Sequence, residues 1–285
     1  MALAPLLLLA PAVLLFAVFV VYPIGASLAL SLQDWDGIGP RAWIGLANYR
    51  ELFAEPVFRT ALANNLLWAA LNLLAPVFGL ALALLLAPRM RFIRVIRALY
   101  ILPFVVSPVV VGLVFAWALN SRFGLLAALA EAAGLGRFAP LDCERWAIVA
   151  VIAAGLWPQT AYCAILYLAG LATMRPEPVE AGMIDGAEGW ALLRHVVLPQ
   201  LRPVTFVAAM VSVIAALRGF DLVLIMTGGG PYDSSTVLGL YMYEQTFLAS
   251  RYGYAASIAA VQFALTAGIV FWFLRRLLRR ERERG

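Results

Sequence analysis

The sequence predicts an all-α membrane protein with six transmembrane helices, and three observations support this fold class. Of its 285 residues, 64% are hydrophobic and 13% are charged, whereas a soluble domain has about 25% charged residues. Six apolar stretches are each long enough to cross a bilayer, which takes about 20 residues in a helix. The arginines, finally, are concentrated in alternate connecting segments, as expected of a chain that crosses a membrane repeatedly.

The expected spans cover residues 5–31, 62–87, 95–119, 146–174, 203–226 and 254–278. With their connecting segments they form one membrane domain, residues 1–285, and leave no room for a sizeable second domain. The alternative for the first stretch is a cleaved signal peptide. Residues 1–5 carry no positively charged side chain and the apolar run is too long for a signal peptide, so we expect a span.

Counting basic residues by segment predicts the orientation of the spans. All 21 basic residues are arginine. With the N-terminus inside, thirteen arginines fall in cytoplasmic segments and seven in the longer outside segments, while Arg218 lies within the fifth span. Because cytoplasmic loops are enriched in basic residues, both termini and the segment 175–202 are expected in the cytoplasm. The arginine-rich end of the chain is expected to lie near anionic membrane lipid.

The same counts exclude several classes of function. Without lysine, the chain has neither a P-loop lysine nor a lysine that forms a Schiff base. Cys143, Cys163 and His195 are too few and too scattered for a tetrahedral zinc site, and the cysteines are expected as small apolar fillers. Topology explains the pI near 9.5 better than nucleic acid binding does. We therefore expect no catalytic residue, no metal site and no nucleic acid partner.

The third span contains a helix-breaking pattern, formed by Pro103, Ser107 and Pro108. Two prolines so close together predict a kink or a broken helix. Broken helices at membrane depth are tolerated where the backbone is packed against protein or faces a cavity. Both a simple packing kink and a role in the substrate path remain open for this span.

The middle of the fourth span combines aromatic and polar side chains and predicts an interrupted helix there. Trp157, Gln159 and Tyr162 lie around Pro158, and polar groups at this depth are costly unless they serve a cavity or helix contacts. Aromatic faces with amide and hydroxyl groups suit a sugar. The candidate substrate-binding residues are Trp157, Gln159, Tyr162, Ser212 and Gln262. Hydrogen bonding between helices is an equally good interpretation.

Other polar residues in the spans receive weaker assignments. Asn65 and Asn72 of the second span are further cavity candidates. Arg218 and Asp221 are three residues apart near the outer end of the fifth span, a spacing that places them on one helix face. We expect these two to form a structural ion pair or gate rather than a proton relay.

The segment 180–203 is the longest one that is neither membrane-like nor linker-like. Its apolar residues recur at helical spacing, at Met183, Ile184, Ala187, Trp190 and Ala191. Acidic residues lie among them, and Gly186 is expected to break the helix just after Asp185. A helix that lies on a membrane surface usually carries basic residues instead. The pattern therefore favours a short amphipathic helix that docks on a protein.

This segment also resembles a known family. It reads E-A-x-x-x-D-G-A followed by an apolar stretch and L-P, similar to the cytoplasmic loop of permease subunits of binding-protein-dependent ABC importers. Gly182 and Leu193 depart from the common pattern, where an alanine and an aromatic residue are usual. Residues 43–49 (W-x-G-L-A-N-Y) and the glycine-rich turn at 226–235 resemble motifs of sugar permeases. Over nearly its full length the chain resembles a permease of a carbohydrate ABC importer of the maltose and glycerol-phosphate type.

The resemblance implies a coupling helix that sits in a groove of a cytoplasmic ATPase. The residues it assigns to this contact are Glu180, Ala181, Ile184, Asp185, Gly186, Ala187, Trp190 and Pro199. It further implies a second, homologous permease in a heterodimer, an ABC ATPase dimer that binds the ATP and Mg²⁺, and an extracytoplasmic solute-binding protein. No cofactor is expected on this chain. The expected location is the cytoplasmic (inner) membrane of a bacterium or archaeon, with multiple passes.

Alternatives to a sugar importer remain at this stage. One alternative is a permease of the same class of importer for another solute, such as a polyol, glycerol phosphate or an oligopeptide. A neutral sugar is favoured because Arg218 is the one basic residue available to a cavity. An ion-coupled secondary carrier needs an ion site, for which Asp221 is the candidate. An intramembrane enzyme needs a nucleophile and a base, and His195 lies in the cytoplasmic segment.

Overall fold

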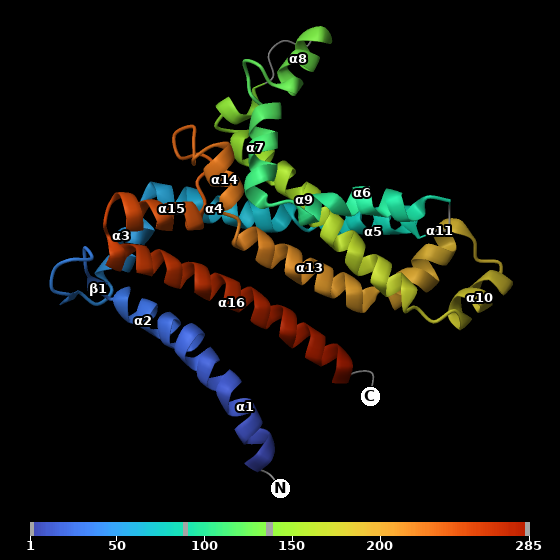
Figure 1. Ribbon diagram of the computed structural model, residues 1–285, viewed down its shortest axis with the longest axis horizontal. Helices are drawn as coiled ribbons and strands as arrows, with labels where there is room; N and C mark the ends of the chain where they lie inside the picture. The colour runs from blue at the N-terminus through green and yellow to red at the C-terminus, as the bar shows by residue number, and fades with distance from the viewer. Residues whose placement is uncertain (1–2, 88–90, 135–138, 283–285) are drawn as a thin grey trace.

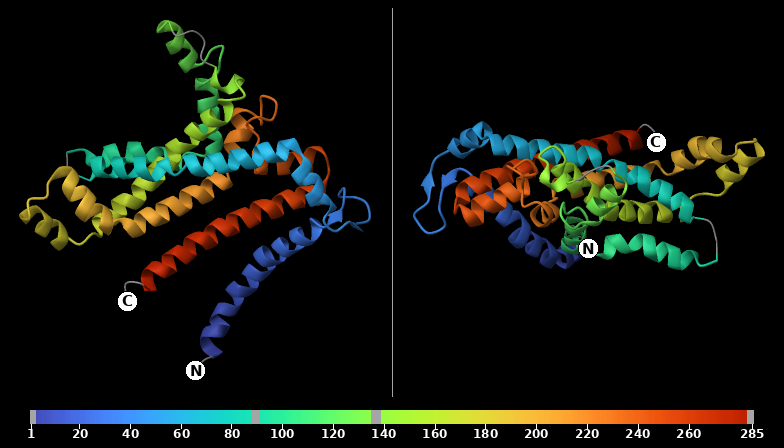
Figure 2. Two further views of the ribbon diagram at one scale, coloured as in Figure 1. Left: turned by 180° about the vertical axis from the view of Figure 1, so that it is seen from behind. Right: turned by 90° about the horizontal axis from the view of Figure 1, so that it is seen from above.

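The computed structural model describes residues 3–87, 91–134 and 139–282, and these are mostly helical. The helices form a long, thin arrangement with one short hairpin at one end and a pair of short helices at the other (Figures 1 and 2). Four helices of the described part are long and apolar enough to cross a membrane, or up to six if each of two bent pairs forms one span. The predicted all-α membrane fold is confirmed at this level.

The first expected span is one continuous helix that stands apart from the rest. It comprises α1 (Leu3–Phe16), a π-helical turn (Ala17–Val21) and α2 (Tyr22–Leu30). No residue in its candidate membrane window is buried. It contacts the body through α2, which packs on the start of α16 (Tyr252–Arg282), and the two helices then diverge (Figures 1 and 2). Strands β1 (Gln33–Asp34) and β2 (Ala42–Trp43) follow as an antiparallel hairpin.

The second expected span is longer than predicted and bent. After α3 (Ala47–Ala54), α4 (Pro56–Leu71) and α5 (Leu74–Leu86) together make a 31-residue candidate span. The bend has a local cause, because Pro76 lacks the N–H that would bond the carbonyl of Asn72. The N–H of Ala75 donates to that oxygen instead, at 3.1 Å, which tightens the turn between α4 and α5.

The third expected span is broken, as the prolines predict. α6 (Ile93–Val105) and α7 (Pro108–Ala118) meet at 95°. Ser107 precedes a proline and is extended, with φ −58° and ψ 139°. Pro108 then begins α7, a position where its missing N–H costs nothing. α7 and the short α8 (Leu125–Ala132) project away from the body (Figure 1).

The fourth expected span differs from its prediction, because it is a continuous helix. α9 (Ala147–Ala172) runs through Pro158 without a break, so the interrupted helix expected here is wrong. A proline inside a helix removes one intrahelical hydrogen bond, and α9 absorbs that loss because it is packed against α5, α6, α13 and α14. Cys163 on this helix is fully buried, in agreement with its assignment as a small filler, whereas Cys143 is exposed.

The fifth expected span is interrupted instead. α13 (Arg202–Leu217) ends at Arg218, and α14 (Asp221–Met226) begins three residues later. Arg218 and Asp221 therefore do not share a helix face, and no ion pair joins them in the described structure. The expected pair is wrong because the chain breaks at Gly219, where a Cβ atom would lie 2.7 Å from the Trp68 ring. The sixth expected span is α16, which extends beyond the predicted range at both ends.

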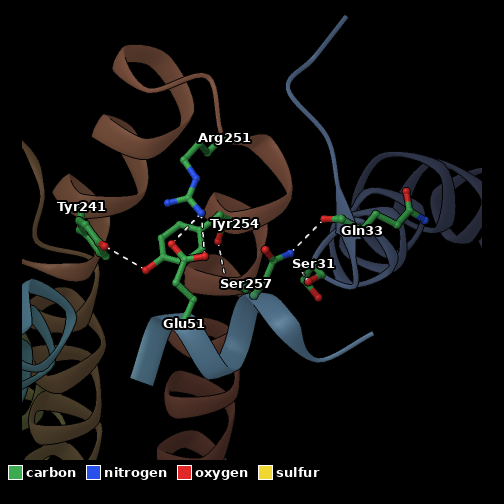
Figure 3. Close-up of polar contacts among 8 residues, drawn as sticks. Ser31, Gln33, Glu51, Tyr241, Arg251, Tyr254 and Ser257 are labelled. Atoms are coloured by element: carbon green, nitrogen blue, oxygen red, sulfur yellow. Dashed lines mark hydrogen bonds and ion pairs between the residues drawn. The ribbon is translucent and has the colours of Figure 1, made fainter. Parts of the chain in front are cut away.

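A polar cluster fastens the end of the molecule where α3, α15 (Leu238–Tyr243) and the start of α16 meet (Figure 3). Arg251 contacts both carboxylate oxygens of Glu51, at 2.7 and 2.8 Å. The hydroxyl groups of Tyr241 and Tyr254 are 3.0 Å apart. Segments separated by about two hundred residues are thus held together at this end. A π-helical turn (Glu244–Leu248) follows α15.

Candidate functional site

Two regions carry the residues singled out by the sequence. The coupling loop, residues 175–202, follows α9 and precedes α13, and it lies at one end of the molecule (Figure 1). It contains α10 (Glu177–Ile184), α11 (Gly189–Leu192), a π-helical turn (Leu193–Val197) and α12 (Leu198–Gln200). The single amphipathic helix expected here is two helices, because the break at Gly186 separates α10 from α11.

The end of α10 explains the D-G-A part of the motif. Gly186 has φ +81°, in the left-handed region that favours glycine. Its N–H donates to the carbonyl of Met183 at 3.1 Å, and the N–H of Ala187 donates to the carbonyl of Gly182 at 2.9 Å. These two bonds form a Schellman motif, which satisfies carbonyls at a helix end that would otherwise lack a donor. The expected break after Asp185 is confirmed.

Gly182, where the resembling family usually has alanine, sits against the second half of the loop. A Cβ atom there would lie 3.0 Å from a methyl carbon of Val196 and 3.3 Å from one of Leu192. These distances are tighter than ordinary van der Waals contact, so glycine lets α10 approach the following turn closely. The departure from the family pattern therefore has a packing reason in this chain.

The outer surface of the coupling loop combines apolar and acidic side chains. Ile184 is 86% exposed and Trp190 is 68% exposed. The carboxylates of Glu180, Asp185 and Glu188 are exposed and make no ion pair or side-chain hydrogen bond within the described residues. Ala181 is exposed beside them, while Ala187 and Pro199 are partly buried and support the turn and α12. His195 bonds the carbonyl of Ala191 within its own helix, at 3.0 Å.

The second region is a cavity of about 260 Å³ between α4, the α6–α7 break, α9 and the α13–α14 break, called the central cavity below. Its polar lining residues are Asn72, Gln159, Arg218 and Asp221. Aromatic faces come from Trp68, Phe104 and Phe220. The interruptions of the second, third and fifth expected spans thus contribute to the wall of this cavity, as expected for irregular backbone at membrane depth.

Hydrogen bonds behind the cavity wall meet at Ser212 of α13, which is fully buried. The Gln159 amide nitrogen donates to the Ser212 hydroxyl at 3.0 Å. The Asn72 amide nitrogen donates to the Ser212 backbone carbonyl at 2.7 Å. Cys163 lies 3.4 Å from the same hydroxyl. Ser212 therefore joins three helices, α4, α9 and α13.

The structure separates the five candidate substrate residues. Gln159 lines the central cavity, and Ser212 lies behind its wall. The Gln262 amide nitrogen donates to the carbonyl of Leu217 at 2.8 Å, and its side chain lines a different cavity of about 280 Å³. Tyr162 stacks on Phe104, with ring centroids 5.0 Å apart. Trp157 is 47% exposed and packs on Phe115 instead.

Asparagines on α4 form a further set of contacts. The Asn65 amide nitrogen donates to the Leu217 carbonyl at 3.2 Å, and its oxygen accepts from the N–H of Leu238 at 2.8 Å. Asn64 donates to the carbonyl of Ser234 in the glycine-rich turn and to that of Thr236 just after it, at 2.8 Å each. Asn65 and Asn72 were predicted from the sequence as cavity candidates, whereas Asn64 and Trp68 were not. The signal for Trp68 was its spacing, since residues 65, 68 and 72 share one helix face.

No group of three or more His, Cys, Asp or Glu residues that could hold a metal ion occurs within residues 3–87, 91–134 and 139–282. The two regions are therefore a hydrogen-bonding cavity with aromatic walls and an exposed surface of mixed apolar and acidic character. Neither brings together a nucleophile and a base.

Comparisons with known proteins give the family and the fold of this chain. A sequence model of the binding-protein-dependent transport system inner membrane component family matches residues 75–284. A probable ABC transporter permease of Pyrococcus horikoshii is 34% identical, with 94% of each chain covered. A trehalose transport permease of Mycobacterium tuberculosis is 32% identical, over 94% of this chain and 87% of the relative.

Among solved structures, a bacterial ABC transporter involved in import of the acidic polysaccharide alginate has a chain with the same fold. The TM-score is 0.84 at 23% identity, over 97% of this chain and 95% of that one. The extent of the family match and the identity of the relatives lead to one conclusion. The chain belongs to the family of binding-protein-dependent transport system inner membrane components.

Proposed function

We propose that this chain is the transmembrane permease subunit of an ATP-driven sugar importer and forms half of the translocation pathway. The observation that carries the proposal is the outer surface of the coupling loop. This surface lies around the end of α10, where Gly186 fixes the turn. It exposes Ile184 and Trp190, and no other element covers it within the described residues. Sugar transport is supported by relatives named for trehalose and for alpha-glucoside transport.

The proposed topology has six spans, with both termini and the coupling loop in the cytoplasm. In this arrangement the α6–α7 pair forms one broken span. The fifth span is formed by α13 together with α14, which follows it after the break at residues 218–220. The excess of arginine in the segments assigned to the inside supports the orientation. The proposed location is the cytoplasmic (inner) membrane of a bacterium or archaeon, with multiple passes.

In the proposed mechanism, the coupling loop docks in a groove of a partner ATPase that binds ATP and Mg²⁺. Ile184 and Trp190 supply apolar contacts, and Glu180 and Asp185 face basic residues of the groove. The loop connects directly to α9 and, through α12, to α13. These helices carry Gln159 and Ser212, so a rigid-body movement of the loop re-orients the cavity wall, which gives alternating access.

The proposed solute site is the central cavity. Its amide groups, a carboxylate and a guanidinium suit the hydroxyl groups of a sugar, and its aromatic faces suit the apolar face of a sugar ring. The volume of about 260 Å³ is slightly below the usual range of roughly 300–1,000 Å³ for ligand pockets. A second, homologous permease in a heterodimer would complete it, and an extracytoplasmic solute-binding protein would deliver the solute.

A specific observation favours one alternative solute. Arg218 lines both the central cavity and the neighbouring cavity of about 280 Å³, and it forms no ion pair in the described structure. A free guanidinium at this position suits an anionic solute, such as glycerol phosphate or an acidic sugar. Polyols and oligopeptides suit the cavity less specifically. An ion-coupled carrier would have to use Asp221, which is exposed at the start of α14.

The experiment that tests the proposal is purification of this chain from its native membrane in mild detergent, followed by reconstitution of the recovered complex into vesicles. We expect a P-loop ATPase and a second six-span permease to co-purify. Sugar uptake into the vesicles should then require ATP and the solute-binding protein. Recovery of the chain alone after crosslinking, or uptake that follows an ion gradient without ATP, would contradict the proposal.

A further inference from the structure

Asn72 lies at the end of α4, where the second span bends. Its side chain lines the central cavity, although the residue is only 2% exposed. The amide nitrogen donates to the backbone carbonyl of Ser212 at 2.7 Å. The amide nitrogen is therefore used in holding α4 to α13, and the amide oxygen is left without a role in this contact.

The amide oxygen of Asn72 has no hydrogen-bond partner among the described residues. This is unusual, because buried polar side-chain atoms are nearly always paired. Asn65 on the same helix provides a direct comparison, since its nitrogen donates to Leu217 and its oxygen accepts from Leu238. The unpaired acceptor thus belongs to the asparagine that lines the cavity and not to the one outside it.

The orientation of the Asn72 amide is fixed by chemistry. The Ser212 backbone carbonyl only accepts hydrogen bonds, so the Asn72 atom that faces it must be the nitrogen. A flipped amide would bring two acceptors together and leave the carbonyl without its donor. The atom left for a ligand is consequently the oxygen, and only a hydrogen-bond donor satisfies it.

Two other polar groups around the cavity also present hydrogen-bond acceptors. Gln159 uses its amide nitrogen on the Ser212 hydroxyl, which leaves its oxygen as the free end of that side chain. Asp221 contributes a carboxylate, which only accepts when ionised. Arg218 is the charged donor among the lining residues. Three of the four polar lining residues, Asn72, Gln159 and Asp221, therefore present acceptors, which complement the hydroxyl groups of a sugar.

We infer that Asn72 determines solute specificity, by accepting a hydrogen bond at its amide oxygen from one particular hydroxyl group of the transported sugar. The inference rests on the proposed function and adds to it the chemical requirement at this wall. A solute that presents a hydroxyl donor to Asn72 is accepted, whereas one that presents a hydrogen, a fluorine or a carbonyl oxygen at that position leaves the buried oxygen unpaired and is rejected.

The test uses the complete importer, with its sister permease, ATPase and solute-binding protein, in vesicles. The probes are trehalose and methyl α-glucoside, each with its series of monodeoxy derivatives, and the readout is the KM of ATP-driven uptake. In the wild type we expect one derivative to have a KM raised about tenfold to a hundredfold over the parent sugar. In Asn72→Leu, which removes the acceptor at similar volume, that derivative and the parent should be transported alike.

The control is Asn65→Leu, which removes an amide from the same helix outside the cavity. It should lower the amount of assembled complex and leave the ratio of the two KM values unchanged. A merely structural role for Asn72 would produce the same behaviour in Asn72→Leu, with reduced uptake of every sugar and an unchanged ratio. If the leucine variant does not assemble, Asn72→Ala provides the same comparison with a smaller side chain.

Two results would overturn the inference. One is equal discrimination between parent and derivative in the wild type and in the Asn72 variant, which would mean that a buried water or the sister subunit satisfies the oxygen. The other is a wild type that discriminates against none of the derivatives. Failure of the proposed function would look different, because the chain would then be recovered without an ATPase, or uptake would follow an ion gradient without ATP.

Discussion

The coupling loop and the central cavity are held together in opposite ways. The coupling loop is stabilised by its own backbone, through the Schellman motif at Gly186 and the contact of Gly182 with Val196. Its characteristic side chains, such as Ile184, point to the outside. The central cavity is made by contacts between residues far apart in the chain, such as Asn72 with Ser212. Its characteristic side chains point inward.

This difference predicts the effects of mutations in the two regions. Mutations in one region should lower stability, and mutations in the other should impair function alone. Residues of the cavity wall also hold the helices together, so changing them should affect folding and transport at once. Residues on the outer surface of the coupling loop are largely exposed and form no ion pair within the described chain. Changing them should leave the isolated subunit as stable as before and affect only the assembled transporter.

Two tryptophans provide the largest expected contrast. Trp68 is 4% exposed and Trp190 is 68% exposed. We expect Trp68→Ala to lower the free energy of unfolding by about 3–5 kcal/mol, because it empties a packed position. Trp190→Ala should change it by less than about 0.5 kcal/mol. Equilibrium unfolding of the purified subunit in detergent measures both, and similar losses in the two variants would remove the basis of the comparison.

The next largest loss of stability is expected for a substitution at a glycine of the cavity wall. Gly219 packs on the Trp68 ring, and a Cβ atom there would lie 2.7 and 2.8 Å from two ring carbons. Gly219→Ala should therefore cost about 1–3 kcal/mol of stability through overpacking. The double variant with Trp68→Ala, which removes the ring, should recover most of this cost. Additive losses in the double variant would show that the ring contact is not the cause.

A glycine of the coupling loop sharpens the functional half of the comparison. Gly186 has φ +81° with open space around its Cα, so Gly186→Val strains the backbone alone, by about 1–2 kcal/mol. We expect ATP-driven uptake to fall at least about tenfold because the exposed surface is misplaced. Gly45 is the matched control, with φ +59° and open space in another loop. Gly45→Val should bring similar strain, and equal loss of uptake would argue against a special role for the coupling loop.

The smallest effect is expected away from both regions. The ion pair of Arg251 with Glu51 in Figure 3 has side chains that are 44% and 48% exposed. Surface pairs of this kind contribute about 0.2–1 kcal/mol. Glu51→Gln should therefore change the unfolding free energy by no more than that and leave uptake unchanged. A larger loss that persists at high salt would show that the pair is screened less than its exposure indicates.

The coupling loop could be predicted from sequence because its structure depends on neighbouring residues. The break after Asp185 follows from Gly186, and the exposed surface follows from helical spacing. The sequence did not show how α11 is placed after this break, since a motif marks a turn without giving the direction of the chain beyond it.

The central cavity could be predicted only in part. Gln159 and Asn72 were noticeable because amides are costly at membrane depth. Trp157 was grouped with Gln159 because the two are close in sequence, yet two residues correspond to about 200° around a helix, so they lie on opposite faces. The break between α13 and α14 depends on Gly219 meeting Trp68, a contact between residues 151 positions apart that no local pattern reveals.

The measurement that tests the central claim most directly is photo-crosslinking from position 184 in native membranes. A photo-reactive phenylalanine derivative replaces Ile184, which is 86% exposed on the coupling loop. The matched control position is Ile38, which is 96% exposed near the hairpin at the opposite end of the molecule (Figure 1). The account predicts a crosslink to a P-loop ATPase from position 184 and none from position 38. Crosslinks from position 184 to lipid alone, or to the ATPase from both positions, would contradict it.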